Sequence, residues 1–405
     1  MDIYMARQPI LDLEKNVYGY ELLYRSKELI MDENDGDIAT LNVINNTIMT
    51  IGFEEVIDKG LAFLNFTSDL IKKDVPLVFN NKSIIIEILE DVEPEDSLMI
   101  KINELKEKGY VFAIDDYDSS YRYDAFLALV DIVKVDFIKT NKYEREDITR
   151  KLKKRNLTLL AEKIETNEEF IEAKRLGYDL FQGFFFQKPQ ILKNREIKAL
   201  NTNHIQAINE LAKAEPDYNE LTEIIKRDVA MTYKFLKLVN SVAFYSRSKI
   251  ESLNDALVRL GFREINKYVF LLMFKHLAVG SPDVLISNAL IRAKFSEGLA
   301  KKSRFRKKYD DFFLLGMFSM IDVILSIPKE EALRDIPISG ELKRALIGME
   351  NNEYSEMMDL IINHERGNFE FVNGILNDFD ISIGTMNNEY FNAIQWNSEI
   401  SREIN

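Results

Sequence analysis

Short apolar runs alternate with charged segments along the first 190 residues of the chain. Runs at 3–13 and 17–25, separated by Glu14, Lys15 and Asn16, predict an opening hairpin. Six further runs lie at 61–66, 83–89, 111–115, 131–137, 157–165 and 179–186. Segments with helical periodicity, such as 95–108 and 144–156, lie between them. This pattern predicts eight strands in alternation with helices.

The predicted strands are apolar on both faces, which is typical of a parallel sheet covered by helices. Eight such strands in under 200 residues favour a closed barrel over a doubly wound sheet, which stays open as the alternative. From about residue 195 the periodicity is helical to the end of the chain. The predicted fold class is α/β, a TIM-like (β/α)8 barrel with an N-terminal β-hairpin at 1–194, followed by an all-α domain at 195–405. Lys188-Pro189 closes the first half, and a linker helix is expected at 191–200.

Composition narrows the class of protein. With 46% hydrophobic and 30% charged residues, the chain is expected to fold into soluble domains. It has no cysteine, which excludes disulfides and thiolate metal sites and is compatible with a reducing cytoplasm. Its start lacks the layout of a signal peptide, and its most apolar stretch, 312–327, is shorter than the roughly 20 residues that span a bilayer. We therefore expect a cytoplasmic protein with no membrane partner.

The net charge of −14 argues against binding to extended nucleic acid or to anionic membranes, because both depend on neutralising phosphate with Lys and Arg. The exception is the basic run KKSRFRKK at 301–308. A solvated helix end or loop is the more ordinary interpretation of such a run, and a local anion or partner site is the alternative.

Polar side chains gather at or near the carboxyl ends of the predicted strands. They are Glu21, Asn65, Glu87, Asp115, Asp116, Lys134, Asp136, Glu165 and Gln182. In a barrel of parallel strands those ends converge on one face, where barrel active sites lie. Carboxylate and amide oxygens suit divalent cations, and two such ions can hold both oxygens of an in-line displacement at phosphorus. Each acid alone could cap a helix or pair with a lysine, but their convergence favours metal-assisted hydrolysis.

Over residues 3–189 the chain resembles the EAL family of cyclic-di-GMP phosphodiesterases, motif by motif and in order. Gln8-Pro9 is similar to the family's opening motif, and ELLYR at 21–25 is similar to its signature Glu-x-Leu-x-Arg. The other motifs fall at Asn65, Glu87 with Glu90, Asp115-Asp116, Lys134 with Asp136, Glu162 with Glu165, and Gln182-Gly183. So many ordered matches are far more specific than a single short motif.

The resemblance implies an EAL-type barrel that binds two Mg²⁺ or Mn²⁺ ions and opens cyclic-di-GMP to the linear dinucleotide pGpG. It implies metal ligands at Glu21, Asn65, Glu87, Asp115 and Asp116. Lys134 would contact metal-bound water or phosphate, and Glu165 would act as a base or water-orienting group. The ligand would be held with help from Gln8, Arg25, Asp136 and Gln182.

The chain departs from the family pattern at two places next to the implied metal ligands. Members that hydrolyse well usually follow the double Asp with Phe-Gly-Thr-Gly, a loop that organises the metal site and the dimer interface. This chain has Tyr117-Asp118-Ser119-Ser120 there, so easy access to positive φ is lost. Lys163 stands where the family prefers Gly, and its cation is expected either to compete with metal for a carboxylate or to point away. The oligomeric state stays open, with a homodimer through the barrel as one alternative.

The segment from Leu221 onward resembles HDOD, a helical output domain related to metal-dependent HD phosphohydrolases, with coverage from about 200 to 390. The matching positions are Asp228, Asn240-Ser241, Asp255-Ala256 and Gly261. Ser319 and Met320 stand where the enzymatic relatives carry His-Asp, which makes hydrolysis by this domain implausible. His276 is expected to be a packed or capping side chain and His364 to lie at the surface. The domain is expected to bind a signalling protein partner or to regulate the barrel.

Two functional hypotheses follow. The first is a weak or regulated metal-dependent cyclic-di-GMP phosphodiesterase. The second is a catalytically inactive cyclic-di-GMP receptor or protein-interaction scaffold. The retained ligand set favours the first and the loop at 117–120 favours the second, so the sequence leaves enzymatic activity open.

Overall fold

The computed structural model describes residues 3–26, 57, 60–89, 92–183, 202–211, 213, 215–240, 250, 252–278, 281–334 and 336–404. The chain forms two compact units: Met1–Lys188 with His364–Glu370, and Pro189–Asn363 with Phe371–Asn405. The linker helix expected at 191–200 lies outside the described residues.

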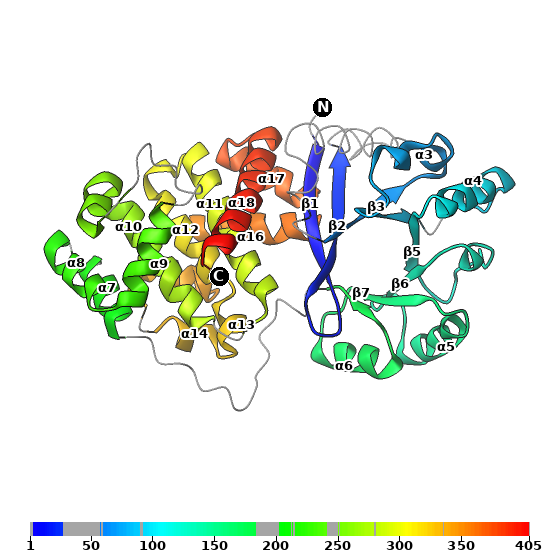
Figure 1. Ribbon diagram of the computed structural model, residues 1–405, viewed down its shortest axis with the longest axis horizontal. Helices are drawn as coiled ribbons and strands as arrows, with labels where there is room; N and C mark the ends of the chain where they lie inside the picture. Colours follow the sequence, from blue (N-terminus) through cyan, green and yellow to red (C-terminus); the bar gives the residue numbers. More distant parts are fainter. Residues whose placement is uncertain are drawn as a thin grey trace. The chain divides into compact units, whose positions relative to one another are not determined.

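A closed barrel of eight strands, β1 to β8 in sequence order, forms the first unit (Figure 1). The strands are β1 (Ile3–Leu11), β2 (Val17–Ser26), β3 (Leu61–Phe66), β4 (Ile84–Ile88), β5 (Val111–Tyr117), β6 (Ile132–Asp136), β7 (Thr158–Glu162) and β8 (Leu180–Phe181). Each coincides with one of the predicted runs. The barrel is therefore confirmed, and the doubly wound sheet is excluded.

Strand β1 departs from a regular (β/α)8 barrel because it runs antiparallel to both neighbours, β2 and β8. The turn between β1 and β2 explains this, since it is far shorter than the crossover of a dozen or more residues that a parallel pair needs. Asp12 stabilises the turn: its Oδ1 accepts hydrogen bonds from the backbone N–H groups of Glu14 (3.0 Å) and Asn16 (2.8 Å). The remaining neighbours, from β2–β3 to β7–β8, pair in parallel.

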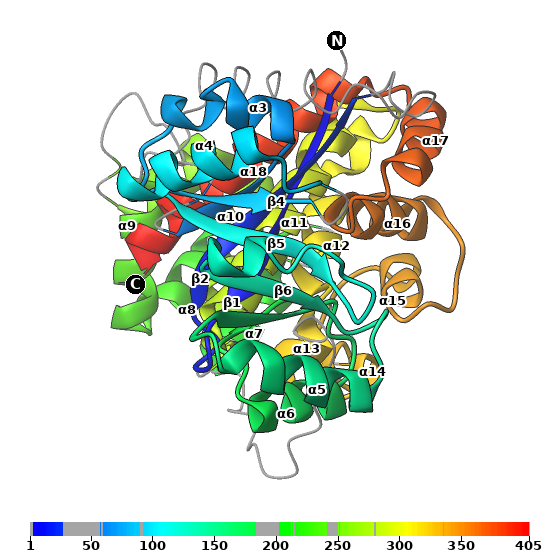
Figure 2. The ribbon, with the colours of Figure 1, turned by 90° about the vertical axis from the view of Figure 1, so that its right-hand side faces the viewer.

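Helices cover the outside of the barrel, as Figures 1 and 2 show for α4, α5 and α6. Among the described residues of this unit, the α-helices are α3 (Ser68–Lys72), α4 (Asp96–Glu107), α5 (Lys142–Lys153) and α6 (Asn167–Leu176). Helices α5 and α6 each begin with a capping box, formed by Asn141 with Glu144 and by Thr166 with Glu169. These caps determine where the loops after β6 and β7 end, and those loops border the carboxyl ends of the strands.

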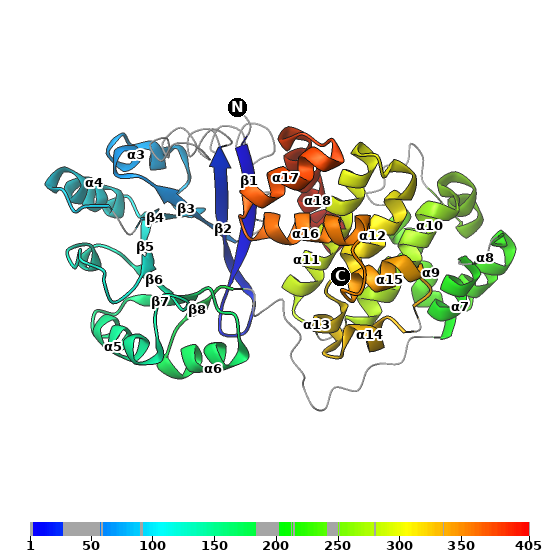
Figure 3. The ribbon, with the colours of Figure 1, turned by 180° about the vertical axis from the view of Figure 1, so that it is seen from behind.

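The described residues of the second unit are helical, and no strand occurs among them (Figure 3). Its helices are α7 (Thr202–Leu211), α8 (Tyr218–Lys226), α9 (Val229–Val239), α10 (Leu253–Leu277), α11 (Asp283–Lys302), α12 (Tyr309–Phe318), α13 (Ile321–Leu325), α14 (Lys329–Ala332), α15 (Gly340–Leu346), α16 (Glu353–Glu365), α17 (Phe369–Phe379) and α18 (Ile383–Ile404). Gly261 ends the first segment of α10, because its φ of 74° and ψ of 167° leave helical geometry. The predicted all-α architecture is confirmed.

The apolar stretch at 312–327 forms the buried helices α12 and α13. Helix α12 packs closely on α11, since a Cβ on Gly316 would lie 2.3 Å from the backbone carbonyl carbon of Arg292. Within the ranges that the structure covers, no helix combines the length and the apolar character needed to cross a membrane.

His364 lies at the start of the segment that completes the first unit, and it is fully buried. In this segment the ring of Phe369 stacks on Tyr4 of β1, with ring centroids 5.1 Å apart. The expectation of a surface position is wrong, because packing against β1 depends on residues more than 350 positions away in the chain. Burial lowers the pKa of His364 to about 4, and a hydrogen bond with the backbone of Met5 opposes that shift.

We expect His364 to make folding stability depend on pH between about 6.5 and 4. The unfolded chain binds a proton at His364 below its ordinary pKa of 6.5, whereas the folded chain resists protonation until about pH 4. The stability that this residue contributes is therefore complete above pH 6.5 and falls by about 3 kcal/mol as the pH drops to 4. Urea unfolding at stepped pH should show this loss in the wild type and a correspondingly smaller one in His364→Phe. Identical pH profiles for the two proteins would contradict the assignment.

Candidate active site

Two layers of side chains fill the barrel, and the second layer carries the chemistry. The first layer is apolar and consists of Ile10, Phe63, Ile85, Ala113, Ile132, Leu160 and Leu180, one from each strand except β2. Because side chains on one face of a strand recur every second residue, the next position on each strand belongs to the layer above. Those positions are Gln8, Asn65, Glu87, Asp115, Lys134, Glu162 and Gln182, and Glu21 occupies the same layer on β2, two residues after Gly19.

Asp115 and Asp116 are neighbours in sequence, yet both contribute to this layer. In a regular strand they would point to opposite faces of the sheet. Here the β5–β6 pairing shifts between Ile114 and Tyr117, and Asp116 adopts a left-handed φ of 47°, which Asp tolerates better than most residues. As a result, carboxylate oxygens of Asp115, Asp116 and Glu162 all lie within 4.8 Å of one another.

Lys134 lies at the centre of a first group of carboxylates and has no exposed surface. Its Nζ lies 2.6 Å from Asp115 Oδ1, 2.8 Å from Glu87 Oε1 and 3.2 Å from Glu21 Oε1. The three acids also lie within 4.8 Å of one another, so they could hold a cation. Burial alone would lower the pKa of Lys134, but the surrounding carboxylates, led by Asp115, raise it well above its ordinary value.

Several buried oxygens of this layer accept no hydrogen bond from any residue that the structure describes. They are Oε2 of Glu87, Oε2 of Glu162, Oε1 of Gln182 and Oδ1 of Asn65, whereas Oε1 of Glu87 and Oδ1 of Asp115 are contacted by Lys134. Burial raises the pKa of Glu87 and of Glu162 well above the ordinary value, and it raises that of Asp115 as well. Buried carboxylates without donors are costly, and a divalent cation bound by their oxygens would offset that cost. The residues present therefore fit a divalent-metal site.

A second group of carboxylates consists of Asp115, Asp116 and Glu162. Two lysines contact its Asp116: Lys163 Nζ lies 2.6 Å from Oδ1, and Lys139 Nζ lies 2.8 Å from Oδ2. Burial would raise the pKa of Asp116, but hydrogen bonds from these lysines lower it. Lys163 also lies 2.7 Å from Oδ2 of Asp136, which is buried beside Glu162 at the ends of β6 and β7.

Gln8 of β1 and Gln182, which follows β8, form hydrogen bonds that reach Glu21 of β2. Gln182 Nε2 donates to Gln8 Oε1 at 3.0 Å and to Glu21 Oε2 at 2.5 Å. The Nε2 of Gln8 donates in turn to the backbone carbonyl of Glu365, within the same unit, at 2.9 Å. The two amides thus orient Glu21. Of the residues assigned to ligand binding, the side chain of Arg25 lies outside the described part of the structure.

Glu165 is not brought into either group of carboxylates. It is exposed three residues beyond the end of β7, and its backbone N–H donates to Glu169 Oε2 at 2.8 Å in the cap of α6. Glu162 is the acid that the strand delivers to the site, where it is buried and lies 3.9 Å from Lys134. The period of two counted from Leu160 could have selected Glu162 from the sequence.

The loop after Asp116 is organised without the two glycines of the EAL pattern. Asp118 Oδ1 accepts hydrogen bonds from the backbone N–H of Ser120 (2.7 Å) and from its hydroxyl (2.6 Å). Beyond this turn, the Tyr121 ring packs on Tyr117 with centroids 4.8 Å apart. No residue from 117 to 120 has a positive φ. The loop therefore has a shape that L-residues adopt readily, supported by an Asp turn and aromatic packing.

In the second unit, Ser319 is used for helix packing. It accepts a hydrogen bond from Arg292 Nη1 (3.2 Å) and donates one to the carbonyl of Gly316 (2.7 Å). Both groups of acids that could share a cation, among the residues with described positions, belong to the barrel. The side chain of His276 lies outside the described part of the structure.

Comparison with known proteins identifies both halves of the chain. The model of the EAL domain matches residues 62–189, and the model of the HDOD domain matches residues 199–333. The uncharacterized protein YuxH of Bacillus subtilis is 36% identical over 389 residues, which cover 94% of this chain and 95% of that protein. The cyclic di-GMP phosphodiesterase CdgJ of Vibrio cholerae is 30% identical over 408 residues, covering 99% and 94%.

Among solved structures, the Bacillus subtilis YkuI protein, with an EAL domain and in complex with cyclic-di-GMP and calcium, matches with a TM-score of 0.40 and 20% identity. That match covers 56% of this chain and 72% of YkuI. The family assignment rests on the relatives that match nearly end to end and on the two domain models. This chain belongs to the family of proteins that join an EAL domain to an HDOD domain.

Proposed function

We propose that the barrel is a Mg²⁺- or Mn²⁺-dependent phosphodiesterase that opens cyclic-di-GMP to linear pGpG, with turnover that is weak or regulated by the HDOD domain. The observation that carries this proposal is the convergence of buried acids into two groups that could each hold a cation, with Oε2 of Glu87, Oε2 of Glu162 and Oδ1 of Asn65 lacking donors among the described residues. Similarity to CdgJ, whose name describes a cyclic di-GMP phosphodiesterase, supports the choice of substrate.

The proposed metal ligands are Glu21, Asn65, Glu87, Asp115 and Asp116, to which we add Glu162. When bound, divalent ions would polarise the phosphodiester and lower the pKa of an attacking water. Lys134 holds the carboxylates of the first group together and supplies positive charge beside the phosphate.

Glu162 is our candidate for the group that accepts the proton of the attacking water. Its carboxylate is buried at the end of β7 beside Asp115 and Asp116, and the oxygen that does not bind an ion would be free to take the proton. This is the role that the family resemblance implies for Glu165, which lies outside both groups of acids. Gln8, Arg25, Asp136 and Gln182 are proposed to orient the metal ligands or the bound dinucleotide.

The proposed domain limits are 1–194 for the barrel and 195–405 for the helical domain. The helical domain is proposed to contact a signalling protein partner, because the metal-binding groups found among the described residues are all in the barrel.

The decisive assay incubates the purified full-length chain with cyclic-di-GMP and Mn²⁺ or Mg²⁺ and follows pGpG by chromatography. We expect product only with metal present, and none from a Glu21→Ala control. Absence of product at high enzyme concentration, with or without added partner proteins, would refute the hydrolase.

One observation favours a receptor that binds cyclic-di-GMP without cleaving it. Both oxygens of Asp116 are already paired with lysines, which weakens Asp116 as a metal ligand. In that case calorimetry would detect cyclic-di-GMP binding while the assay above yields no pGpG.

A further inference from the structure

Lys163 places a positive charge among the second group of carboxylates. Its Nζ contacts Asp116 and Asp136 at 2.6 and 2.7 Å, and it lies 3.8 Å from Glu162 Oε1. Asp116 and Glu162 are two of the three acids that could hold a second divalent ion. The lysine therefore supplies charge where a second ion would supply it.

The two groups of acids differ in how far the protein itself satisfies their oxygens. In the first group, Lys134 contacts one oxygen each of Glu21, Glu87 and Asp115, and it leaves Oε2 of Glu87 and Oδ1 of Asn65 without a donor among the described residues. In the second group, Asp116 accepts hydrogen bonds at Oδ1 from Lys163 and at Oδ2 from Lys139. A Mg²⁺ ion needs carboxylate oxygens at about 2.0–2.1 Å, and an ammonium bonded to the same oxygen would repel it. A second ion must therefore displace a lysine.

The backbone at Lys163 is already shaped for glycine. Its φ of 58° lies in the left-handed region, which glycine adopts freely and lysine adopts at a cost. The next residue is anchored, because the Ile164 N–H donates to the Gln182 carbonyl at 3.0 Å. The backbone of Ile164 also packs closely on Gly183: a Cβ added to Gly183 would lie 2.2 Å from the Ile164 carbonyl oxygen. Replacement of Lys163 by glycine should therefore leave the loop in place.

We propose that Lys163 occupies the second cation subsite, so that the protein binds one divalent ion tightly and a second only when this side chain swings away. The side chain is 37% exposed, which leaves it a route into solvent. This inference deepens the proposed function and rests on its metal site. It makes Lys163 a positioning residue that limits metal loading.

The test counts Mn²⁺ ions bound to the full-length chain, using the electron paramagnetic resonance signal of free Mn²⁺ and calorimetry. The wild type should bind one ion tightly, and Lys163→Gly should bind a second ion about 10–100-fold more tightly than the wild type does. Lys163→Met, which keeps the bulk and removes the charge, should shift the second affinity in the same direction. The control Lys153→Met removes a lysine that pairs with Asp179 at 2.9 Å, outside both groups of acids, and should change nothing.

Two tight ions in the wild type, or an unchanged second affinity in Lys163→Gly, would overturn the inference. Its failure is separable from failure of the proposed function, because ion counting needs no turnover. Hydrolysis with an unchanged ion count would refute only the role of Lys163. The predicted change in ion count without any pGpG would support that role and refute only the hydrolase.

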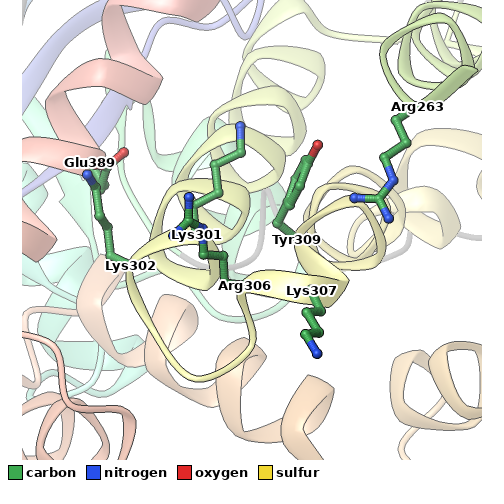
Figure 4. Close-up of a pocket in the computed structure, with 7 residues that line it drawn as sticks. All are labelled: Arg263, Lys301, Lys302, Arg306, Lys307, Tyr309 and Glu389. Atoms are coloured by element: carbon green, nitrogen blue, oxygen red, sulfur yellow. The ribbon is translucent and has the colours of Figure 1, made fainter. Parts of the chain in front are cut away.

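A basic hollow of about 940 Å³ lies on the second unit, at the junction of α11 and α12 (Figure 4). The basic residues that line it are Arg263, Lys301, Lys302, Arg306 and Lys307, beside Tyr309 and Glu389. Four of the five come from α11, α12 or the turn between them, where the sequence has KKSRFRKK. This is a local concentration of positive charge in a chain of net charge −14.

The basic run divides into cations that stabilise the fold and cations that do not. Lys301 pairs with Glu297 at 2.8 Å, Lys308 pairs with Glu353 at 2.7 Å, and the Arg304 guanidinium lies over the Phe305 ring at 4.9 Å. The members with neither an acidic partner nor an aromatic ring beneath them, within the described ranges, are Lys302, Arg306 and Lys307, all exposed and all lining the hollow. Three cations that no other described side chain engages therefore face this space.

We propose that this hollow binds a small ligand that carries two or more phosphate groups. Unpaired cations that repel one another gain most from a ligand with several negative charges. The planar fork of Arg306 suits bidentate phosphate binding, and the two lysines add point charges. The volume is that of a small-molecule site.

The probe is inorganic triphosphate, titrated into the full-length chain by calorimetry at low and moderate salt. We expect saturable binding that weakens with salt, and at least about a tenfold loss in a variant with Lys302, Arg306 and Lys307 all changed to Gln. A matched control changes Lys226, Arg227 and Lys234, also two lysines and one arginine, also exposed and outside the hollow, to Gln. No binding by the wild type, or an equal loss in the control, would overturn the proposal. So would binding to phosphatidylglycerol vesicles without binding to triphosphate.

Discussion

Glu87→Gln should abolish divalent-ion binding and reduce hydrolysis of cyclic-di-GMP by about 10²–10³-fold or more, without destabilising the metal-free barrel. Glu87 is fully buried; its Oε1 contacts Lys134 at 2.8 Å, and its Oε2 has no donor among the described residues. Burial raises its pKa well above the ordinary value, so the charged carboxylate is a cost to the empty site. A neutral amide of the same shape removes that cost and also removes a metal ligand.

Two measurements are needed to check this prediction. Urea unfolding in EDTA should give a free energy of unfolding for Glu87→Gln equal to or above that of the wild type, while Mn²⁺ titration should show lost binding. Glu107→Gln, at the exposed end of α4, is the matched control and should change neither. A Glu87→Gln protein that binds Mn²⁺ like the wild type would remove Glu87 from the metal site.

Lys134→Met should destabilise the metal-free barrel by about 3–5 kcal/mol, because it leaves several buried carboxylates without their shared counter-charge. Lys134 has no exposed surface, and it lies within 3.2 Å of oxygens of Glu21, Glu87 and Asp115. Mn²⁺ should restore part of the loss, since an ion that binds only the folded state stabilises it by about 2.7 kcal/mol at a hundred times its Kd.

Urea unfolding of Lys134→Met with EDTA and with excess Mn²⁺ measures both effects. Lys106→Met is a suitable control, because Lys106 pairs with Asp131 at 2.6 Å but both side chains are partly exposed. Such a pair should contribute less than about 1 kcal/mol. If Lys134→Met and Lys106→Met lose the same small amount, the carboxylates are neutral in the metal-free protein and need no counter-charge.

The alternation of residues in the strands made most of the site predictable. Every parallel strand from β3 to β8 places an apolar residue in the lower layer and a polar residue two positions later, as in Ile85 with Glu87. A period of two is a property of the extended chain itself, so it can be read without knowing the fold. The strands, the barrel and the all-α second half follow from the same kind of pattern.

Other features depended on backbone details that no periodicity encodes. Asp116 joins Asp115 in the site only because β5 is irregular there and its φ is positive. Glu165 sits three residues past Glu162, where the chain has left the strand and begun the cap of α6. Both glutamates belong to the same sequence motif. Glu162 is buried because it is the last residue of β7, and Glu165 is exposed because it follows the strand.

The sequence by itself determined the order of strands and helices, the polar layer at the carboxyl ends, and its suitability for divalent cations. The pairing of charges across the barrel follows only from the folded chain. Lys163 and Asp116, 47 residues apart, form an ion pair, and Lys134 meets Glu21, 113 residues away. The fold also buries His364. Such contacts depend on the closure of the barrel, which brings distant strand ends within a few ångströms, whereas local pattern acts over a few residues.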